Sequence, residues 1–172
     1  LAISAGVFMS WSTFLVVEPL YVRDILHRSA TTLGLLQTVF GVGLVGMGLL
    51  LPRLGPWVAT PRAVAASVVL SGVAAAVYVG TSSIVVAFVG VFLWGLDVAF
   101  FAAPSRTLLQ RATPVHAHGR VLSLFNTVES WVSMIAIPIA GVLASQLGVR
   151  GVAFLAAAIA TTAGVLLASG GR

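Results

Sequence analysis

Residues 63–103, AVAASVVLSGVAAAVYVGTSSIVVAFVGVFLWGLDVAFFAA, decide the fold class of this chain. This stretch of 41 residues contains one charged side chain, Asp97, and its one polar break is the GTSS sequence at 80–83. A helix that crosses the roughly 30 Å of hydrocarbon in a bilayer needs about 20 apolar residues, and its backbone satisfies its own hydrogen bonds. The stretch is too long for one crossing. It therefore predicts two transmembrane helices joined by a tight turn.

The composition of the whole chain also indicates a membrane protein. Of its 172 residues, 59% are hydrophobic and 8% are charged, against about 25% charged residues in an ordinary soluble domain. This excludes a soluble globular domain, a disordered tail and a nucleic-acid-binding arm, so we expect no nucleic-acid partner. The net charge of +5 comes from arginines at the ends of uncharged runs. With no cysteine, the chain has no disulfide framework and no thiolate metal site.

Apolar windows elsewhere predict four further crossings. We expect six transmembrane helices at about residues 1–22, 32–51, 63–80, 84–103, 121–143 and 152–169. Polar or Pro/Gly-rich stretches at 23–30, 52–62 and 104–120 are the expected connections. The chain begins at Leu1 without a cationic stretch or a small-residue cleavage site, so we expect a segment of a longer protein and no signal peptide.

The arginines predict the orientation of these helices. An even number of crossings places both termini on one side of the membrane, and the connections on that side, with the C-terminal tail, carry six arginines against three on the other. Cytoplasmic loops are enriched in basic residues, so we expect cytoplasmic termini. The absence of Lys beside abundant Arg, Ala, Val and Gly indicates a GC-rich bacterial genome and hence the bacterial plasma membrane.

Carboxylates inside the predicted helices are the first candidate functional residues. A carboxylate at mid-membrane depth costs about 2.5–3.5 kcal/mol on insertion scales, so it is retained where it faces a protein interior or a wet cavity. Asp97 shares a helix face with Trp94, and Glu129 shares one with Asn126. The functional interpretation is proton carriage or recognition of a cationic ligand. The structural alternative is that each carboxylate pairs with an arginine or a hydroxyl and holds the helices in register.

Glu18 lies beside Pro19 near the outer end of the first helix, with Trp11 on the same side. We expect this carboxylate at the membrane interface, where a charge costs little. In the fifth helix, Pro138 followed by Gly141 predicts a bend that could act as a hinge.

Glycines recur every seven residues in the second helix and predict close approach of a neighbouring helix. The three positions of this repeat are Gly34, Gly41 and Gly48, and Gly43 and Gly46 lie between them. No third ligand accompanies His116 and His118, so we expect no metal. No nucleophile, base or phosphate-binding motif is recognisable, and we expect neither a cofactor nor an enzyme activity.

Two connections resemble those of a known transporter family. Residues 48–55, GLLLPRLG, resemble the G-x-L-x-D-R-x-G loop of the major facilitator superfamily, with Pro52 in place of the aspartate. The matching positions include Gly48, Arg53 and Gly55. Residues 108–124, LLQRATPVHAHGRVLSL, resemble the connection after the tenth helix in drug, macrolide and siderophore exporters of that superfamily, with Arg120 leading into a Ser-rich helix.

The resemblance covers essentially the whole chain and implies a fold. It implies an all-α membrane protein whose six helices form two inverted three-helix repeats, equivalent to helices seven to twelve of a twelve-helix transporter. The first and fourth helices would then line a central cavity, with the fifth beside them. The residues placed in or beside this cavity are Glu18, Trp11, Trp94, Asp97, Asn126 and Glu129.

The function implied is that of the C-terminal half of a secondary transporter, exporting a small amphipathic compound in exchange for protons. Trp11 and Trp94 would supply apolar contacts, while Arg53 and Arg120 would serve a cytoplasmic gate with Gly48 and Gly55. The expected partners are the lipid bilayer, a small-molecule substrate and the N-terminal six-helix half. Two alternatives stay open, namely the membrane domain of an ATP-driven transporter and a non-transporting scaffold subunit.

Overall fold

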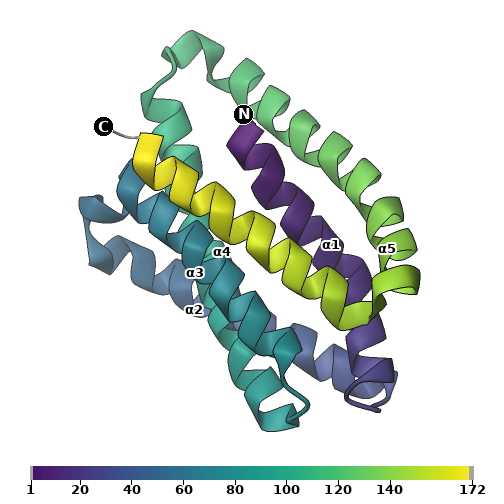
Figure 1. The fold of residues 1–172 in the computed structure, drawn as a ribbon. Helices are drawn as coiled ribbons and strands as arrows, with labels where there is room; N and C mark the ends of the chain where they lie inside the picture. The colour runs from purple at the N-terminus through teal and green to yellow at the C-terminus, as the bar shows by residue number, and fades with distance from the viewer. Residues whose placement is uncertain (1, 171–172) are drawn as a thin grey trace.

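The computed structural model describes the backbone of residues 2–170 and the side chains of residues 8–166. The described chain is helical and contains no strand, which confirms the all-α prediction (Figure 1). Short 3-10 turns, η1 (Pro56–Val58) and η2 (Val115–Ala117), precede the third and fifth helices. The α-helices are α1 (Ala2–Asp24), α2 (Ala30–Leu54), α3 (Pro61–Gly80), α4 (Ile84–Arg111) and α5 (His118–Gly170).

The long helix α5 is interrupted at Gly148. This residue has φ 74° and ψ 164°, a conformation outside the helical region that a glycine adopts without a Cβ clash. The chain reverses direction near this point, so the green and yellow parts of α5 run in opposite directions on either side of the turn (Figure 1). We call residues 118–147 the first arm and residues 149–170 the second arm of α5.

Much of the described chain has the length and composition of membrane-spanning helix. Four segments within the described residues are long and apolar enough to cross a bilayer. They are Ala30–Leu54, Pro61–Gly80, Ile84–Arg111 and Val115–Leu166. Their burial differs: the α3 window is 61% buried, whereas the α2 window is 11% buried. α2 therefore presents most of its apolar surface outward.

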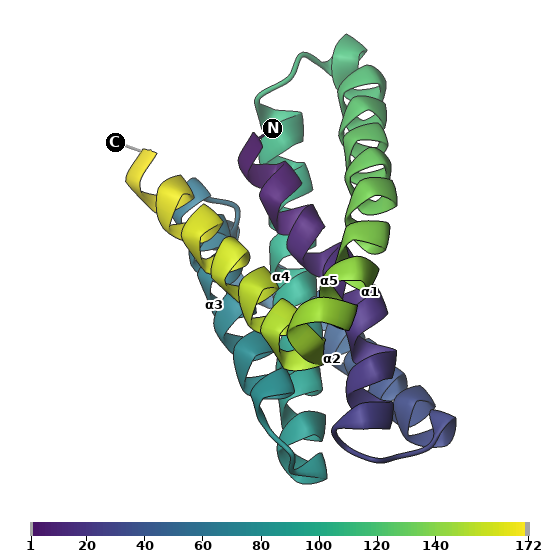
Figure 2. The same ribbon diagram turned by 45° about the vertical axis from the view of Figure 1, so that its right-hand side comes forward.

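The helices pack in a pattern that repeats. α1 lies between the two arms of α5, and Figure 2 shows the same arrangement from another side. α4 packs against α2 and α3 in the corresponding way, and α3 packs against α5. This pattern is the one expected when the first three helical segments and the last three form two repeats.

The ends of the bundle differ in which connections they carry. The α2–α3 and α4–α5 connections lie at the end where α1 begins and α5 ends, and the α1–α2 and α3–α4 connections lie at the other end (Figure 2). We call these the terminal end and the opposite end. This is the alternation expected of successive crossings.

The close helix contact predicted from the glycines of α2 occurs at one of the two glycines between the repeat positions. A Cβ added at Gly34, Gly41 or Gly48 would meet nothing within 4 Å. The close approach occurs at Gly43, where a Cβ would collide with the carbonyl oxygen of Phe92 on α4. Gly95 of α4 makes the reciprocal approach, since its Cβ would collide with the carbonyl oxygen of Phe40.

The connection expected at 104–120 is shorter than predicted. α4 continues through Pro104 to Arg111 before the turn that leads to η2. A proline removes one backbone hydrogen bond, and a packed helix accommodates that loss with a bend. The extension places Asp97 close to the middle of α4, 13 residues after Ile84 and 14 before Arg111.

Candidate functional site

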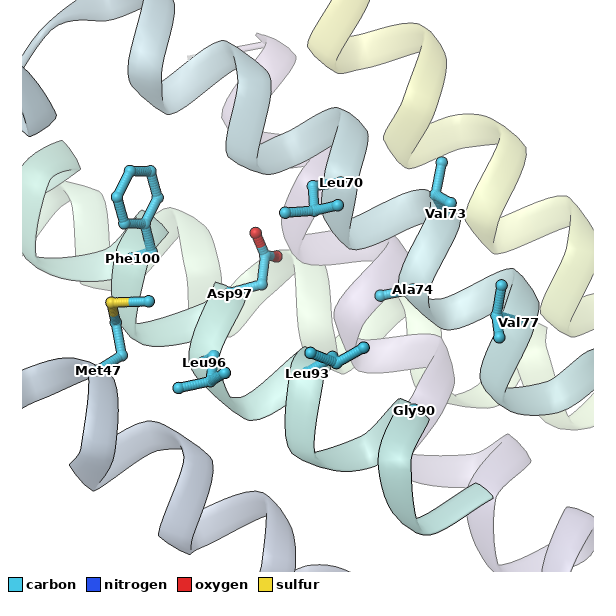
Figure 3. Close-up of a pocket in the computed structure, with 10 residues that line it drawn as sticks. All are labelled: Met47, Leu70, Val73, Ala74, Val77, Gly90, Leu93, Leu96, Asp97 and Phe100. Atoms are coloured by element: carbon cyan, nitrogen blue, oxygen red, sulfur yellow. The ribbon is translucent and has the colours of Figure 1, made fainter. Parts of the chain in front are cut away.

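The candidate site is centred on a cavity of about 410 Å³ between α2, α3 and α4. We call it the Asp97 cavity, because Asp97 is its one charged lining residue (Figure 3). The rest of its wall is apolar and includes Met47, Leu70, Val73, Leu93 and Phe100. Figure 3 shows the Asp97 side chain extending from α4 toward α3, on the side of Leu70.

The Asp97 carboxylate is buried without a hydrogen-bonding partner. Asp97 is 4% exposed, and neither carboxylate oxygen makes a hydrogen bond of normal geometry with the described residues. The side chain extends toward α3, where Ser71 directly follows the cavity-lining Leu70 (Figure 3). Buried polar groups in proteins are nearly always hydrogen-bonded. A buried carboxylate without donors is therefore a candidate site for a proton or a cationic ligand.

Trp94 lies in the core and not in the wall of the Asp97 cavity. Its ring packs 5.0 Å from the ring of Phe14 on α1 and 5.3 Å from that of Phe40 on α2. Its indole nitrogen is buried and lacks a hydrogen-bond partner among the described residues. The interpretation of Trp94 as a cavity-lining contact therefore does not apply to this cavity.

Glu129 lines a second, smaller cavity of about 50 Å³ between α1, α4 and α5, which we call the Glu129 cavity. Arg106 of α4 lines it as well, and aromatic rings form much of its wall. Trp11 packs edge-on against Phe101 at 5.1 Å between ring centroids. Asn126, predicted on the same stripe as Glu129, is exposed and does not line this cavity.

The two cavities of this chain are separate. The Asp97 and Glu129 cavities share no lining residue, so Asp97 and Trp11 lie in different cavities. The reason is the helical rotation of about 100° per residue. Phe101 follows Asp97 by four positions and is displaced by about 40° around α4. That displacement turns it toward α1 and α5, while Asp97 faces α3.

Glu18 is buried among neighbouring helices at 3% exposure, and its depth at the membrane interface stays a prediction. Tyr78 of α3 donates a hydrogen bond of 2.9 Å to one of its oxygens. Gln37 of α2 donates a hydrogen bond to the other. Tyr21 extends this network by donating to the carbonyl oxygens of Tyr78 and Thr81, at 2.8 and 2.9 Å. Glu18 therefore joins α1, α2 and α3 through donors that are distant in sequence.

The residues predicted for a cytoplasmic gate lie at the terminal end. Gly55 ends α2 with φ 82°, a left-handed conformation that favours glycine. Arg53 is exposed in the last turn of α2, where a cation complements the helix dipole. Gly48 and Arg120 are also exposed. The described residues assign no ion-pair partner to either arginine, and their gate role stays a prediction.

The predicted hinge lies within regular helix. α5 has non-helical backbone at Gly148 and runs through Pro138 and Gly141 without another such residue. Both are exposed, and a Cβ on Gly141 would meet nothing within 4 Å. A hinge at these positions stays a prediction.

Sequence reasoning missed several polar side chains that surround the carboxylates. Gln37 and Tyr78 donate hydrogen bonds to Glu18, Asp97 extends toward the helix that carries Ser71, and Arg106 lines the same cavity as Glu129. Arg106 carried no usable signal, because it lies in the stretch 104–120 that was expected to form a connection. Ser71 carried none, since small hydroxyl residues are common along these helices.

Long apolar helices in a repeated packing pattern, with buried carboxylates, define a multi-pass membrane protein. The chain matches the sequence profile of the Major Facilitator Superfamily over residues 1–170. It therefore belongs to this superfamily and to the class of secondary transporters. No curated protein sequence and no solved structure matched the chain. The alternatives of an ATP-driven transporter domain and a scaffold subunit gain no support, and members of the superfamily are generally transporters rather than enzymes.

Proposed function

We propose that this chain is one six-helix half of a transporter that exports small amphipathic compounds in exchange for protons. The observation that supports this best is Asp97, a buried carboxylate without a hydrogen-bonding partner in an apolar cavity of about 410 Å³. Ligand sites for small molecules are typically apolar cavities of about 300–1,000 Å³ with a few polar groups. The cavity therefore has the size and chemistry for an apolar compound with one cationic group.

Exchange follows from the electrostatics of such a site. An isolated carboxylate in a low-dielectric interior is strongly disfavoured unless a proton or another cation neutralises it. A proton and a cationic compound would therefore compete for Asp97, and binding of one would favour release of the other. Competition for one buried charge is the simplest physical basis of antiport.

Glu129 is the second proposed charge site, with Arg106 beside it in the Glu129 cavity. A second six-helix half would pair with this one, and rocking of one half against the other would expose the sites alternately. We place the terminal end in the cytoplasm of a bacterial cell, because its connections carry most of the arginines. Arg53 and Arg120 would there contact the other half or lipid headgroups.

The test is accumulation of fluorescent cationic dyes in bacterial cells that express the full-length transporter, with and without a proton uncoupler. We expect dye exclusion that the uncoupler abolishes and that Asp97→Asn removes. Glu129→Gln should change its pH dependence. Asp24→Asn is the matched control, because Asp24 is exposed and paired with Arg23. Uncoupler-sensitive exclusion that survives Asp97→Asn would exclude this carboxylate as the charge site.

A further inference from the structure

The hydroxyl of Ser71 is bonded differently from most hydroxyls in these helices. Serine and threonine side chains in helices usually donate to a carbonyl oxygen one turn earlier. Ser67, one turn before Ser71 on α3, does so by donating to the Val64 carbonyl oxygen at 2.7 Å. Ser71 makes no such bond among the described residues, and its Oγ instead accepts a hydrogen bond from Trp11 Nε1 at 3.3 Å.

The proton of the Ser71 hydroxyl is therefore available. An indole N–H is a donor only, so Trp11 cannot accept this proton. Ser71 is 2% exposed, and water does not supply an acceptor at its surface. The Asp97 carboxylate extends from α4 toward α3 on the side of Leu70, the neighbour of Ser71 (Figure 3), and neither of its oxygens has a hydrogen-bond partner among the described residues. Because it is an anion on the facing helix, this carboxylate is the favoured acceptor for the Ser71 hydroxyl proton.

We propose that Ser71 is a positioning residue that couples the charge of Asp97 to Trp11, and thereby links the Asp97 cavity to the Glu129 cavity. The three side chains come from α4, α3 and α1 in that order. Trp11 lines the Glu129 cavity, and Asp97 lines the other. The inference rests on the proposed function in one respect, that the charge of Asp97 changes during transport.

The coupling follows from the cooperativity of hydrogen bonds in a low-dielectric interior. When Asp97 is ionised, it attracts the Ser71 proton and makes the Ser71 oxygen a better acceptor for the indole N–H of Trp11. When a proton or a cationic ligand neutralises Asp97, the bond to Trp11 weakens. Because the Trp11 ring packs edge-on against Phe101 at 5.1 Å and Phe8 at 6.1 Å, a shift of the indole alters the wall of the Glu129 cavity.

Other charged groups near Trp11 have to be separated from this effect. Glu129 of α5 and Arg106 of α4 line the same cavity as Trp11. Glu18 of α1 lies seven residues further along the helix and is held by its own two donors. The Asp97 cavity has no second charged lining residue. A test must therefore change Asp97 directly and hold Glu129 constant.

The test measures the fluorescence emission of Trp11 in the full-length transporter, obtained as the difference between each variant and the same variant carrying Trp11→Phe. Asp97→Asn removes the charge without a change of pH. We expect this substitution to shift the Trp11 emission maximum, and to shift it equally in a Ser67→Ala background. In a Ser71→Ala background the shift should be lost. Ser67 is the matched control, because it has the same 2% exposure and lies one turn away.

A shift that persists with Ser71→Ala would overturn the inference, and so would its absence in the unmodified background. Ser71→Cys serves as a second variant, since a thiol occupies the position of the hydroxyl but is a weaker donor and acceptor. It should give an intermediate shift. The result of this fluorescence experiment is independent of the result of the dye-export experiment. If Asp97→Asn leaves dye export intact but shifts Trp11 through Ser71, the proposed function fails and the coupling stands.

Discussion

Glu18 and Asp97 are the two most deeply buried carboxylates of the described chain, at 3% and 4% exposure, and they differ in what surrounds them. Glu18 accepts hydrogen bonds from Gln37 and Tyr78 on two neighbouring helices. Asp97 accepts none of normal geometry and lines a cavity. The extent of burial alone therefore does not distinguish a structural carboxylate from a functional candidate. The number of hydrogen-bond donors around the carboxylate does distinguish them, because donors offset the free-energy cost of burying the charge.

A second comparison concerns the two repeats. The cleft between α1 and the two arms of α5 corresponds to the Asp97 cavity in the repeated packing pattern, but its volume is about 40 Å³. Thr13 provides a polar side chain there, and its hydroxyl donates to the carbonyl oxygen of Met9 at 2.8 Å. The cleft beside α1 is thus nearly closed, and its polar side chain is hydrogen-bonded. The Asp97 cavity is open, and its carboxylate has no hydrogen-bond donor among the described residues. The asymmetry supports the proposed ligand site beside α4, the first helix of the second repeat.

The largest expected effect is on stability and distinguishes the two carboxylates directly. Glu18→Ala leaves the donors of Gln37 and Tyr78 without an acceptor, and each orphaned buried donor costs about 1–3 kcal/mol. The loss should total several kcal/mol and lower the apparent melting temperature of the purified transporter. Asp97→Asn removes an unsatisfied charge and should leave that temperature unchanged or raise it. A larger loss of melting temperature for Asp97→Asn than for Glu18→Ala would contradict the distinction between a structural and a functional carboxylate.

A smaller effect is expected from one donor of the Glu18 network. Tyr78→Phe removes a hydrogen bond to a charged group, worth about 1.5–3 kcal/mol. The same substitution in a Glu18→Gln background should cost less, because the acceptor is then neutral. Thermal unfolding of the two single variants and the double variant gives the coupling energy. Additive effects would show that Tyr78 does not stabilise the Glu18 charge.

Reactivity toward a polar thiol reagent sharpens the comparison without a stability measurement. The chain has no cysteine, so each introduced thiol is the only one contributed by this segment. Asp97→Cys should react, because the cavity beside it admits small molecules. Glu18→Cys should stay protected behind its neighbours. Complete protection of Asp97→Cys in every transport state would exclude a wet pathway at this position.

The smallest effect is expected for an exposed carboxylate. The Arg23 guanidinium, 2.6 Å away, lowers the pKa of Asp24. Because the folded-state pKa is the lower one, any stabilisation is present above the unfolded value and is lost as pH falls through the folded value. Solvent and salt screen this exposed pair, so Asp24→Asn should not change the melting temperature measurably. A large, pH-dependent change in the melting temperature of Asp24→Asn would show that burial does not determine how much a carboxylate contributes to stability.

The fold class and the family were predictable from the sequence. Long apolar segments specify helices in a bilayer wherever they occur, because each helix satisfies its own backbone. The loop pattern around Arg53 and Gly55 then indicated the family that the profile match established. The same local reasoning recognised Asp97 and Glu129 as costly charges in apolar helices.

Contacts between distant residues were not predictable in this way. Glu18 depends on donors 19 and 60 residues away, and no local pattern marks Gln37 or Tyr78 as its partners. The glycines of α2 indicated a close helix contact, but the sequence did not distinguish Gly43, which makes it, from the repeat positions, which do not.

Hydropathy and helical periodicity are properties of a single segment, and they established an all-α membrane protein with charges in unusual places. The partner of each charge depends on how the helices rotate and slide against one another. A displacement of about 40° around α4 suffices to turn Phe101 away from Asp97, and the two residues line separate cavities. The satisfied state of Glu18 and the unsatisfied state of Asp97 therefore arise from the packing of three or more helices, which no single segment encodes.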